Sequence, residues 1–206
     1  MPETRGATPP GPPTVRGQQR REAILDAAAA LFLERGFHGA SIDEVGAAAG
    51  ISGPGVYRHV ASKDALLMAV LDRLWSEGFG PAVRRGADLP PREALAGLID
   101  AHVDLAIGQS TALVLLVTEL RHLPGDYRDR ALHNHRRYLD AWVGPLRQLR
   151  PDATDDEARG VATAIHGLID SAARVPDLVD DVDPATRTPL LRRLAAELVE
   201  TFVRAG

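Results

Sequence analysis

The sequence contains no cysteine, a single lysine (Lys63) and few aromatic residues, with Phe, Trp and Tyr making up 4% of the chain. The lack of cysteine excludes a disulfide framework, a thiolate metal site and a cysteine nucleophile. No apolar run reaches the roughly 20 residues that span a bilayer, and the N-terminus lacks the apolar core of a secretory signal. These absences favour a cytoplasmic protein without a membrane partner.

Charge is distributed unevenly along the chain. The formal net charge of −4 argues mildly against a nucleic-acid partner. Residues 1–63, however, hold 7 Lys and Arg against 6 Asp and Glu, whereas the remainder holds 17 against 22. The first third is therefore the less acidic part, and a DNA surface there would need its few cations on one side.

The first 16 residues form a proline-rich segment. Prolines at positions 2, 9, 10, 12 and 13 prevent helix formation, and nothing in the segment can build a core. We expect a disordered tail over residues 1–16. The alternative is an arm, carrying Arg5 and Arg16, that lies along DNA phosphates or in a minor groove.

An amphipathic helix is expected from about residue 18 to residue 35. Ile24, Leu25, Ala28, Leu31 and Phe32 share one face at helical spacing. Gly36 is suited to end this helix, because glycine readily adopts positive φ. The arginines at positions 20 and 21 occupy the first turn, where they are either solvated or close to a phosphate.

Residues 41–60, SIDEVGAAAGISGPGVYRHV, have the pattern of two short helices joined by a turn. Ser41 and Glu44 have the spacing of a capping box. Gly50 can take positive φ and end the first helix, and Ser52 can cap the second. This pattern predicts a helix-turn-helix, whose second helix fits a DNA major groove. An ordinary helical hairpin is the alternative.

The run from Arg20 to Leu67 resembles the DNA-binding domain of the tetracycline-repressor (TetR) family of transcription regulators. The matching features are Ile24 to Phe32, Gly36 and Phe37, Ser41 and Ile42, Val45, Ala49 to Ser52, Gly55, Tyr57, His59, and Ser62 and Lys63 with Leu66 and Leu67. Three departures are Val60 in place of the usual Phe, Val45 and Gly46 in place of Ile and Ala, and Gly53 with Pro54. The last pair removes side-chain donors from the recognition helix.

The resemblance implies how this stretch would contact DNA. Tyr57 and His59 are similar to the family's phosphate-contacting pair, and Lys63 to its lysine at the start of the long helix. Base reading would fall to Arg58, with the glycines allowing close approach. The residues expected to bind DNA are Arg20, Ser41, Ser52, Gly53, Gly55, Tyr57, Arg58, His59 and Lys63. Tyr57 could instead be a half-buried core residue.

The remainder of the chain is expected to be helical as well. A long helix follows Ser62 and is weakened near Gly78, Gly80 and Pro81. Further apolar stripes separated by Gly and Pro predict helices near 95–107, 111–123 and 126–149. A fourth helix is expected to start after a second capping box at Thr154, and a last helix to follow an acidic loop over residues 175–184. We therefore predict an all-α fold, with a small helix-turn-helix domain and a larger C-terminal domain.

The last two helices are predicted to form a homodimer face. Small residues recur at helical spacing from Gly160 to Ser171, and the apolar stripe of the final helix is wider than a one-sided helix needs. The expected dimerisation residues are Gly160, Ala164, Gly167, Leu191, Leu194 and Leu198. The alternative is that both helices are internal.

The C-terminal domain is expected to hold an effector pocket. Apolar walls with a few polar groups are typical of such cavities. The expected lining is Trp75, Phe79, His102, Glu119, His122, Tyr138, Trp142 and His166, although each of these could simply belong to the core. No catalytic or phosphate-binding motif is present, His133 and His135 are badly spaced to share a metal, and we expect no enzyme activity, cofactor or metal.

Together these features predict a ligand-responsive DNA-binding transcriptional regulator. We expect residues 17–63 to bind a palindromic operator and residues 64–206 to bind the effector and form the homodimer. The expected mode is repression, relieved by a small apolar or amphipathic molecule. The competing hypothesis is a helical small-molecule-binding protein with a degenerate DNA-binding domain, favoured by the acidic net charge and by Gly53 with Pro54.

Overall fold

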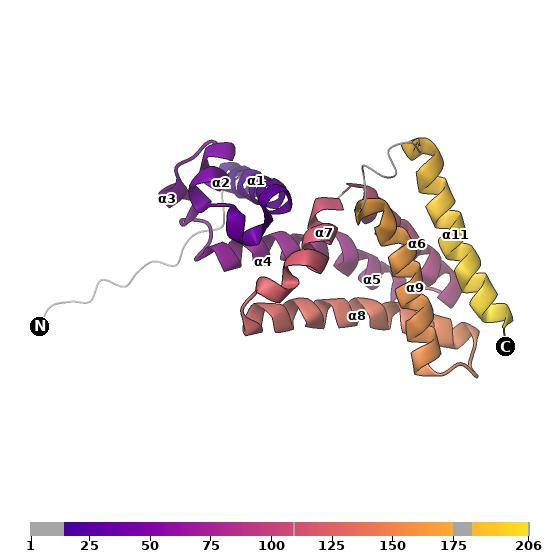
Figure 1. Cartoon of the computed structure of the whole chain (residues 1–206). Helices are drawn as coiled ribbons and strands as arrows, with labels where there is room; N and C mark the ends of the chain where they lie inside the picture. The colour runs from indigo at the N-terminus through magenta and orange to yellow at the C-terminus, as the bar shows by residue number, and fades with distance from the viewer. Residues whose placement is uncertain (1–14, 109, 175–182, 206) are drawn as a thin grey trace, which may run out of the picture.

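A computed structural model describes residues 15–108, 110–174 and 183–205 of the chain. Every regular element among these residues is a helix, which confirms the predicted all-α fold. Helices α1 to α3 form a small unit at one side of the molecule, and α11 lies at the opposite side (Figure 1). Residues 1–14 of the predicted tail and most of the predicted acidic loop, residues 175–182, lie outside the described residues. The last two residues of the predicted tail, Val15 and Arg16, are instead the first residues of α1.

Helix α1 (Val15–Gly39) has a kink at Gly36, whose φ of 72° is in the left-handed region. This confirms the predicted helix end, because glycine adopts that conformation without the strain of a side chain. The chain then turns back so that the Phe37 ring meets the Phe32 ring edge-on, with 5.4 Å between ring centroids. Both rings are buried in the core of the small unit.

Helices α2 (Ile42–Ala48) and α3 (Gly53–Val56) form the predicted helix-turn-helix. The Glu44 amide donates to Ser41 Oγ at 3.2 Å, and the Ser41 amide donates to Glu44 Oε2 at 2.8 Å, which confirms the capping box. The Ser41 hydroxyl also donates to Glu44 Oε2 at 2.7 Å, and this bond, together with the one from the Ser41 amide, lowers the pKa of the Glu44 carboxyl. Gly50 has the predicted positive φ of 69°, and Ser52 Oγ accepts from the amide of Gly55. The second helix is short, although single turns continue it to residue 60.

Two glycines allow α2 and α3 to pack closely. A Cβ on Gly46 would lie 2.9 Å from the Gly53 nitrogen and 2.9 Å from the Ser52 carbonyl carbon. A Cβ on Gly53 would overlap the carboxylate of Asp43. Gly46 lowers the helix propensity of α2, but its lack of a side chain is what lets the two backbones approach.

The long helix predicted after Ser62 is a single rod of three parts. Helix α4 (Lys63–Arg73) begins at Ser62, whose Oγ accepts from the Ala65 amide. The π-helix η1 (Leu74–Phe79) follows without a break, and α5 (Gly80–Gly86) completes the rod. The expected weakening therefore takes the form of a π-helical segment that starts earlier, at Leu74. Such segments are rare and frequently lie at functional sites.

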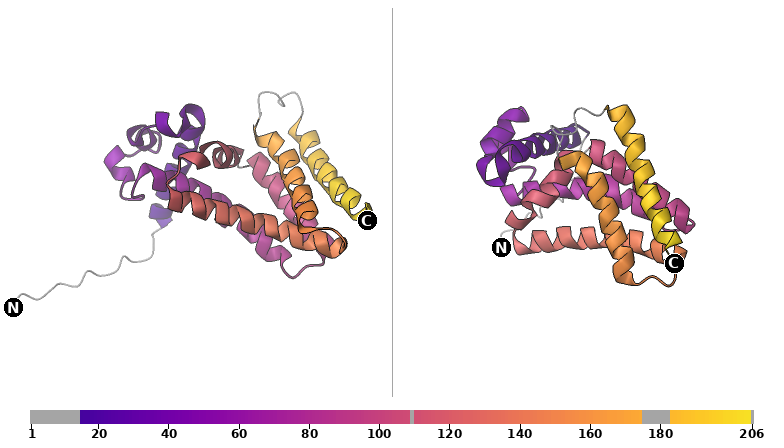
Figure 2. Two further views of the ribbon diagram at one scale, coloured as in Figure 1. Left: turned by 60° about the horizontal axis from the view of Figure 1, so that its bottom comes forward. Right: turned by 45° about the vertical axis from the view of Figure 1, so that its right-hand side comes forward.

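The remaining helices complete the larger unit. They are α6 (Pro91–Gly108), α7 (Ser110–Glu119) with the short 3-10 helix η2 (Leu120–His122), α8 (Gly125–Leu149), α9 (Asp155–Arg174) and α11 (Pro184–Arg204). Helix α6 packs on α5, α8, α9 and α11, so it occupies the centre of the larger unit. Figure 2 shows α9 and α11 side by side on the outside of that unit.

Among the described residues, no single helix is long and apolar enough to cross a membrane; only the bent pair Pro91–Gly108 and Thr111–His122 reaches that level when taken together.

The close approach of α2 and α3 leads to a prediction about stability. Gly46→Ala should lower the free energy of unfolding by about 1–3 kcal/mol, because the added methyl group overpacks the contact. Chemical denaturation measures this change. Gly97→Ala is the control, since Gly97 lies in α6 with no atom within 4 Å of an added Cβ. Equal stability of Gly46→Ala and the wild type would contradict this account of the packing.

Candidate nucleic-acid interface and ligand cavity

The end of α3 presents an exposed polar cluster formed by Tyr57, Arg58 and His59. Tyr57 is 54% exposed, Arg58 is exposed and His59 is half-buried. No side chain of these three hydrogen-bonds to another described residue, so their donors are available to a partner. The exposure of Tyr57 argues against the alternative of a core residue. Ser41 and Ser52 are also exposed, at the caps of the two helices.

Three residues expected at this surface have other contacts. Gly53 is buried against Asp43, so its backbone faces α2 and not the surroundings. Gly55 is half-buried beside Ser52 and Ile51. Arg20 Nη1 donates to the carbonyl of Ala49 at 3.0 Å and thus holds the C-terminal end of α2. Gly53 and Arg20 therefore fix the geometry of the helix-turn-helix.

Lys63 is held close to the small unit. Its Nζ donates to the carbonyl of His38 at 3.5 Å and lies 4.7 Å from the centroid of the Phe37 ring. The ammonium group is thus at the first turn of α4, beside the end of α1. This position fixes the ammonium relative to α1, and a cation–π contact of this kind contributes about 0.5–1 kcal/mol at exposed sites.

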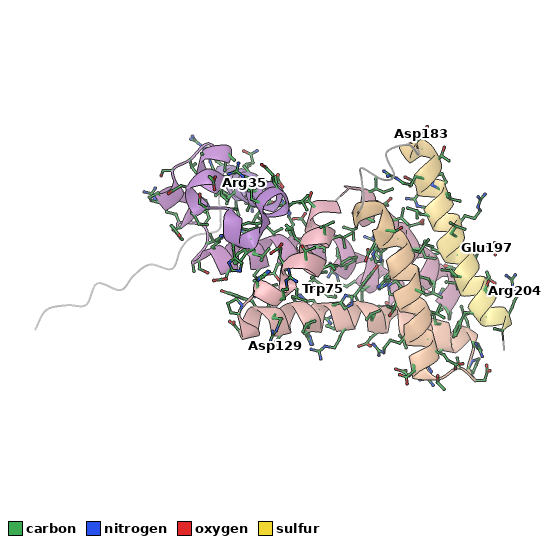
Figure 3. All side chains as sticks on the ribbon, in the orientation of Figure 1. Arg35, Trp75, Asp129, Asp183, Glu197 and Arg204 are labelled. Carbon is green, nitrogen blue, oxygen red and sulfur yellow. The ribbon has the colours of Figure 1, made fainter. Side chains whose placement is uncertain are left out.

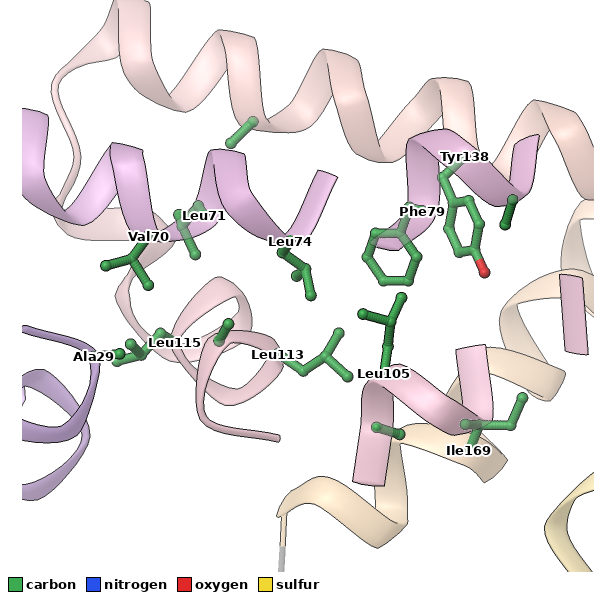
Figure 4. Packing of buried hydrophobic residues seen from close by; sticks show 14 of the residues in the cluster. Ala29, Val70, Leu71, Leu74, Phe79, Leu105, Leu113, Leu115, Tyr138 and Ile169 are labelled. Carbon is green, nitrogen blue, oxygen red and sulfur yellow. The ribbon is translucent and has the colours of Figure 1, made fainter. Parts of the chain in front are cut away.

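A cavity of about 390 Å³ lies between η1, α6, α7, α8 and α9. Of the residues expected to line a pocket, it brings together Phe79, His102, Tyr138 and His166. Phe79 stacks on Tyr138 with 4.2 Å between ring centroids, and the rings of His102 and His166 are 4.6 Å apart. Figure 4 shows Phe79 between Tyr138 and Leu105. The volume is in the range of small-molecule sites.

The two tryptophans lie close to this cavity but do not line it. Trp142 is fully buried, and its ring meets that of His166 edge-on at 4.9 Å. Trp75 lines a smaller space of about 30 Å³ that shares Phe79 and His135 with the cavity and extends along α4. Figure 3 shows Trp75 near α8, and the Arg137 guanidinium is 5.3 Å from its ring centroid.

Several lining residues were not expected from the sequence. Helix α7 supplies Leu113, Leu116 and Val117, α8 supplies His135 and Leu139, and α9 supplies Thr163, Gly167 and Asp170. The sequence could have predicted Asp170 as a lining residue, because Asp170 follows His166 by four residues and so lies on the same face of the helix. His135 likewise precedes Tyr138 by three. Nothing in the sequence indicates that these faces meet.

A buried relay of hydrogen bonds joins three of these side chains. Tyr138 OH lies 3.2 Å from His102 Nδ1, and His102 Nε2 lies 2.9 Å from Asp170 Oδ1. Burial raises the pKa of Tyr138 far above its usual value, so the hydroxyl keeps its proton and donates it to Nδ1. His102 is then protonated at Nε2 and donates to the Asp170 carboxylate.

The other two histidines of the cavity favour the uncharged state. His166 is 6% exposed, and its Nε2 is buried without a hydrogen-bond partner among the described residues. Burial, which disfavours the charged form, lowers its pKa well below 6.5. His135 lies at the mouth, where its ring is partly exposed, and desolvation also lowers its pKa. Both rings are therefore neutral donors and acceptors at neutral pH.

Glu119 and His122 do not line the cavity but lie where α7 meets the small unit. Glu119 Oε2 accepts from the Phe37 amide at 3.4 Å. Arg121 Nε donates to His122 Nε2 at 3.1 Å, so His122 carries its proton on Nδ1 and donates it to His38 Nε2 at 3.2 Å. These contacts could not be predicted from the sequence, because the partners are more than 80 residues apart.

Among the described residues, no group of three or more His, Asp or Glu has an arrangement that could hold a metal ion. The histidines of the cavity are instead bonded to Tyr138 and Asp170 or packed against other rings.

The residues expected at a dimer face divide into two groups. Gly160, Ala164 and Gly167 are exposed on α9, and no atom lies within 4 Å of a Cβ added to either glycine. On α11, Leu194 and Leu198 are 41% and 38% exposed. Leu191, in contrast, is only 7% exposed and belongs to the core of the protomer. The exposed members form one surface, because α9 and α11 pack on each other.

Comparison with known proteins gives matches over both parts of the chain. Residues 24–70 match the family model described as bacterial regulatory proteins, tetR family. Residues 88–174 match the model described as tetracyclin repressor-like, C-terminal domain. The HTH-type transcriptional repressor KstR2 of Mycobacterium tuberculosis (strain ATCC 25618 / H37Rv) is 30% identical over 155 residues, which cover 69% of this chain and 76% of that protein.

Two further matches have other names. The HTH-type transcriptional activator FasR of Mycolicibacterium smegmatis is 36% identical over 110 residues, or 50% of this chain and 49% of that protein. The crystal structure of AibR in complex with isovaleryl coenzyme A and operator DNA has a TM-score of 0.69 at 23% identity, and the match covers 86% of this chain and 96% of that one. The last match shows that the fold is shared.

The neutral histidines of the cavity predict how stability depends on pH. An unfolded imidazole titrates near pH 6.5, whereas His166 and His135 have lower pKa values in the folded state. The unfolded chain therefore binds more protons below about pH 6.5, and the free energy of unfolding should fall there by at most about 1.4 kcal/mol per pH unit for each histidine. Chemical denaturation from about pH 7.5 to pH 5.5 measures the slope.

Two variants identify the source of that slope. His166→Leu should flatten it, whatever its effect on stability at pH 7.5, whereas His133→Leu should leave it unchanged, because His133 is exposed on α8 outside the cavity. A slope that His166→Leu does not alter would show that the buried ring does not titrate on unfolding.

Proposed function

The chain belongs to the tetR family of bacterial regulatory proteins and is a DNA-binding transcriptional regulator, and we propose that it acts in the cytoplasm as a repressor. In this proposal a homodimer binds a palindromic operator, and a small apolar or amphipathic effector in the cavity releases it. Two features of the structure carry the proposal together. An exposed polar cluster whose side chains make no hydrogen bonds to other described residues lies at the end of α3, and a cavity with apolar walls lies at the other end of the α4–η1 part of the rod.

Contact with DNA falls to the residues around α3. Tyr57 and His59 supply hydrogen-bond donors for phosphates, and Arg58 can pair with guanine or a phosphate. Ser41, Ser52 and Lys63 lie at helix N-termini, where backbone amides and the helix dipole favour a phosphate. Gly53 and Arg20 act indirectly, by holding α2 and α3 in position. The shortness of α3 implies few base contacts for one protomer.

A dimer compensates for those few contacts. Two copies of a helix-turn-helix read two half-sites, so that the operator is expected to be palindromic. The exposed small residues on α9 allow a second copy to approach closely, and Leu194 and Leu198 on α11 supply apolar area. We assign the dimer surface to this part of α9 and α11, without Leu191.

Repression is the mode supported by the relative that spans most of the chain. KstR2, which is named a repressor, covers 69% of the chain, whereas FasR, which is named an activator, covers 50%. The AibR crystal structure contains both isovaleryl coenzyme A and operator DNA, so the same fold holds a small molecule and DNA in another protein.

Two connections link the cavity to the DNA-binding unit. The first is the rod. In it Phe79 forms a cavity wall, and Arg73, the last residue of α4, donates to Glu22 at 3.1 Å and to Asp26 at 2.7 Å on α1. The second is α7, which lines the cavity and carries Glu119, the acceptor for the Phe37 amide. A ligand that displaces η1 or α7 would thus reorient α1 and Lys63. Coupling of this kind typically amounts to about 1–3 kcal/mol.

The DNA interface predicts the behaviour of one arginine. Arg58→Ala should weaken binding to a mixed-sequence duplex and lower the slope of log affinity against log salt by about 1, since one fewer counterion is released. Fluorescence anisotropy over a salt series measures both quantities. Arg85→Ala is the matched control, because Arg85 is equally exposed but lies on α5 in the larger unit. An unchanged slope for Arg58→Ala, or an equal loss in the control, would refute the assignment.

The dimer surface predicts the effect of a buried charge. Ala164→Glu should weaken self-association by about 100-fold or more, because each copy brings an unpaired carboxylate into the contact. Sedimentation at micromolar concentration measures the change. Ala96→Glu, at an exposed position of α6, should remain dimeric. A wild-type protein that sediments as a monomer would overturn the assignment.

A further inference from the structure

The cavity has an apolar body and a polar inner end. Its apolar walls come from Phe79, Leu113, Leu116, Val117 and Leu139. Its inner end holds the buried rings of His102, Tyr138 and His166, whereas Val117 and His135 are exposed at the mouth. A ligand that fills the cavity therefore needs an apolar body with one polar group, and that group would lie at the buried end.

The polar groups of the inner end are only partly satisfied. Tyr138, His102 and Asp170 are bonded to one another in the relay, with donors and acceptors matched. His166 lines the cavity, is almost fully buried and has an Nε2 without a hydrogen-bond partner among the described residues. Buried polar atoms in native proteins nearly always have a partner. A hydrogen-bonding group brought by a ligand would supply what the His166 ring lacks.

The charge of the lining decides what kind of polar group fits. Among the described lining residues, Asp170 is the only one with a fixed charge, and that charge is negative. Burial lowers the pKa of His135 and His166, so these two rings are neutral, and Tyr138 is neutral as well. A carboxylate or phosphate at the inner end would lie near the Asp170 carboxylate, and stabilising it would require His166, which burial keeps neutral, to take up a proton. A cation would lose its hydration and find its carboxylate already bonded to His102.

We propose that the cavity takes an uncharged amphipathic molecule, with an apolar body against α7 and the π-helical segment and a single hydroxyl or carbonyl group beside His166. This inference rests on the proposed function, since it assumes that the cavity is an effector site. It selects one chemical class from the apolar and amphipathic molecules considered there. The small space along Met68, Leu71 and Trp75 would receive the end of a longer apolar body.

The test is a series of probes with one carbon skeleton and different heads: octanol, octanone, octanoate, octylamine and octanoyl coenzyme A. Binding to the full chain is measured by titration calorimetry and by tryptophan fluorescence, since Trp142 contacts His166. Octanol or octanone should bind at least about tenfold more tightly than octanoate and octylamine near pH 8. The affinity for octanol should be unchanged between about pH 8 and pH 6.5, whereas that for octanoate should rise as the pH falls, because its binding requires proton uptake.

Variants place the ligand within the cavity. His166→Leu should weaken octanol binding about tenfold through loss of one hydrogen bond to a buried group, and His133→Leu should leave it unchanged. Asp170→Asn should bring the affinity for octanoate closer to that for octanol, because the repelling charge is removed. These changes are read as ratios between probes on the same variant, so a moderate loss of stability does not obscure them.

Several results would overturn the proposal. Tighter binding of octanoate, octylamine or octanoyl coenzyme A than of octanol would show that a charged group is recognised, and binding of no probe would show that the cavity does not accept this class. DNA affinity is measured on the same samples. If octanol binds as expected and DNA affinity is unchanged, the ligand class stands and the effector function fails. If a charged probe binds and DNA is released, the effector function stands and the class is refuted.

Discussion

The stacking of Phe79 on Tyr138 is the contact on which the rest of the structure depends. It joins the end of the π-helical segment to α8, with 4.2 Å between the ring centroids. Gly78 precedes Phe79 and lets Leu105 approach the rod closely, because an added Cβ would lie 2.4 Å from Leu105 Cδ2 and the leucine would have to move. The same rod begins at Lys63 in the small unit. One aromatic pair therefore determines both a wall of the cavity and the position of the helix that leads to α3.

The polar contacts have a different role from the apolar core. Most buried side chains of the larger unit are aliphatic or aromatic, and burying each such side chain stabilises the fold by about 1.5–3 kcal/mol. The relay from Tyr138 through His102 to Asp170 orients these three side chains, because each donor has one acceptor. The junction between the two units also has polar contacts, with Arg73 on Glu22 and Asp26, and Glu119 on Phe37. Polar contacts of this kind can be exchanged at modest cost, as a switching interface requires.

The sequence was sufficient for features that depend on neighbouring residues. The capping box at Ser41, the positive φ at Gly36 and Gly50, and the caps at Ser52 and Ser62 each follow from contacts within four residues. Features that depend on distant residues could not be predicted. Glu119 and His122 were expected in the cavity and lie instead against α1, and Gly53 was expected to face DNA and is buried against Asp43. A helical pattern identifies which residues share a face, but not which helix packs against that face.

The central claim is that the surface around α3 recognises a specific DNA sequence, and selection of bound duplexes from a random pool tests it most directly. The purified wild type is compared with Tyr57→Ala, whose side chain is 54% exposed, and with Leu89→Ala, a control that is 44% exposed in the larger unit. The account predicts an enriched palindrome with the wild type and with Leu89→Ala, and its loss with Tyr57→Ala. No enrichment by the wild type at low salt, or equal enrichment by Tyr57→Ala, would contradict it.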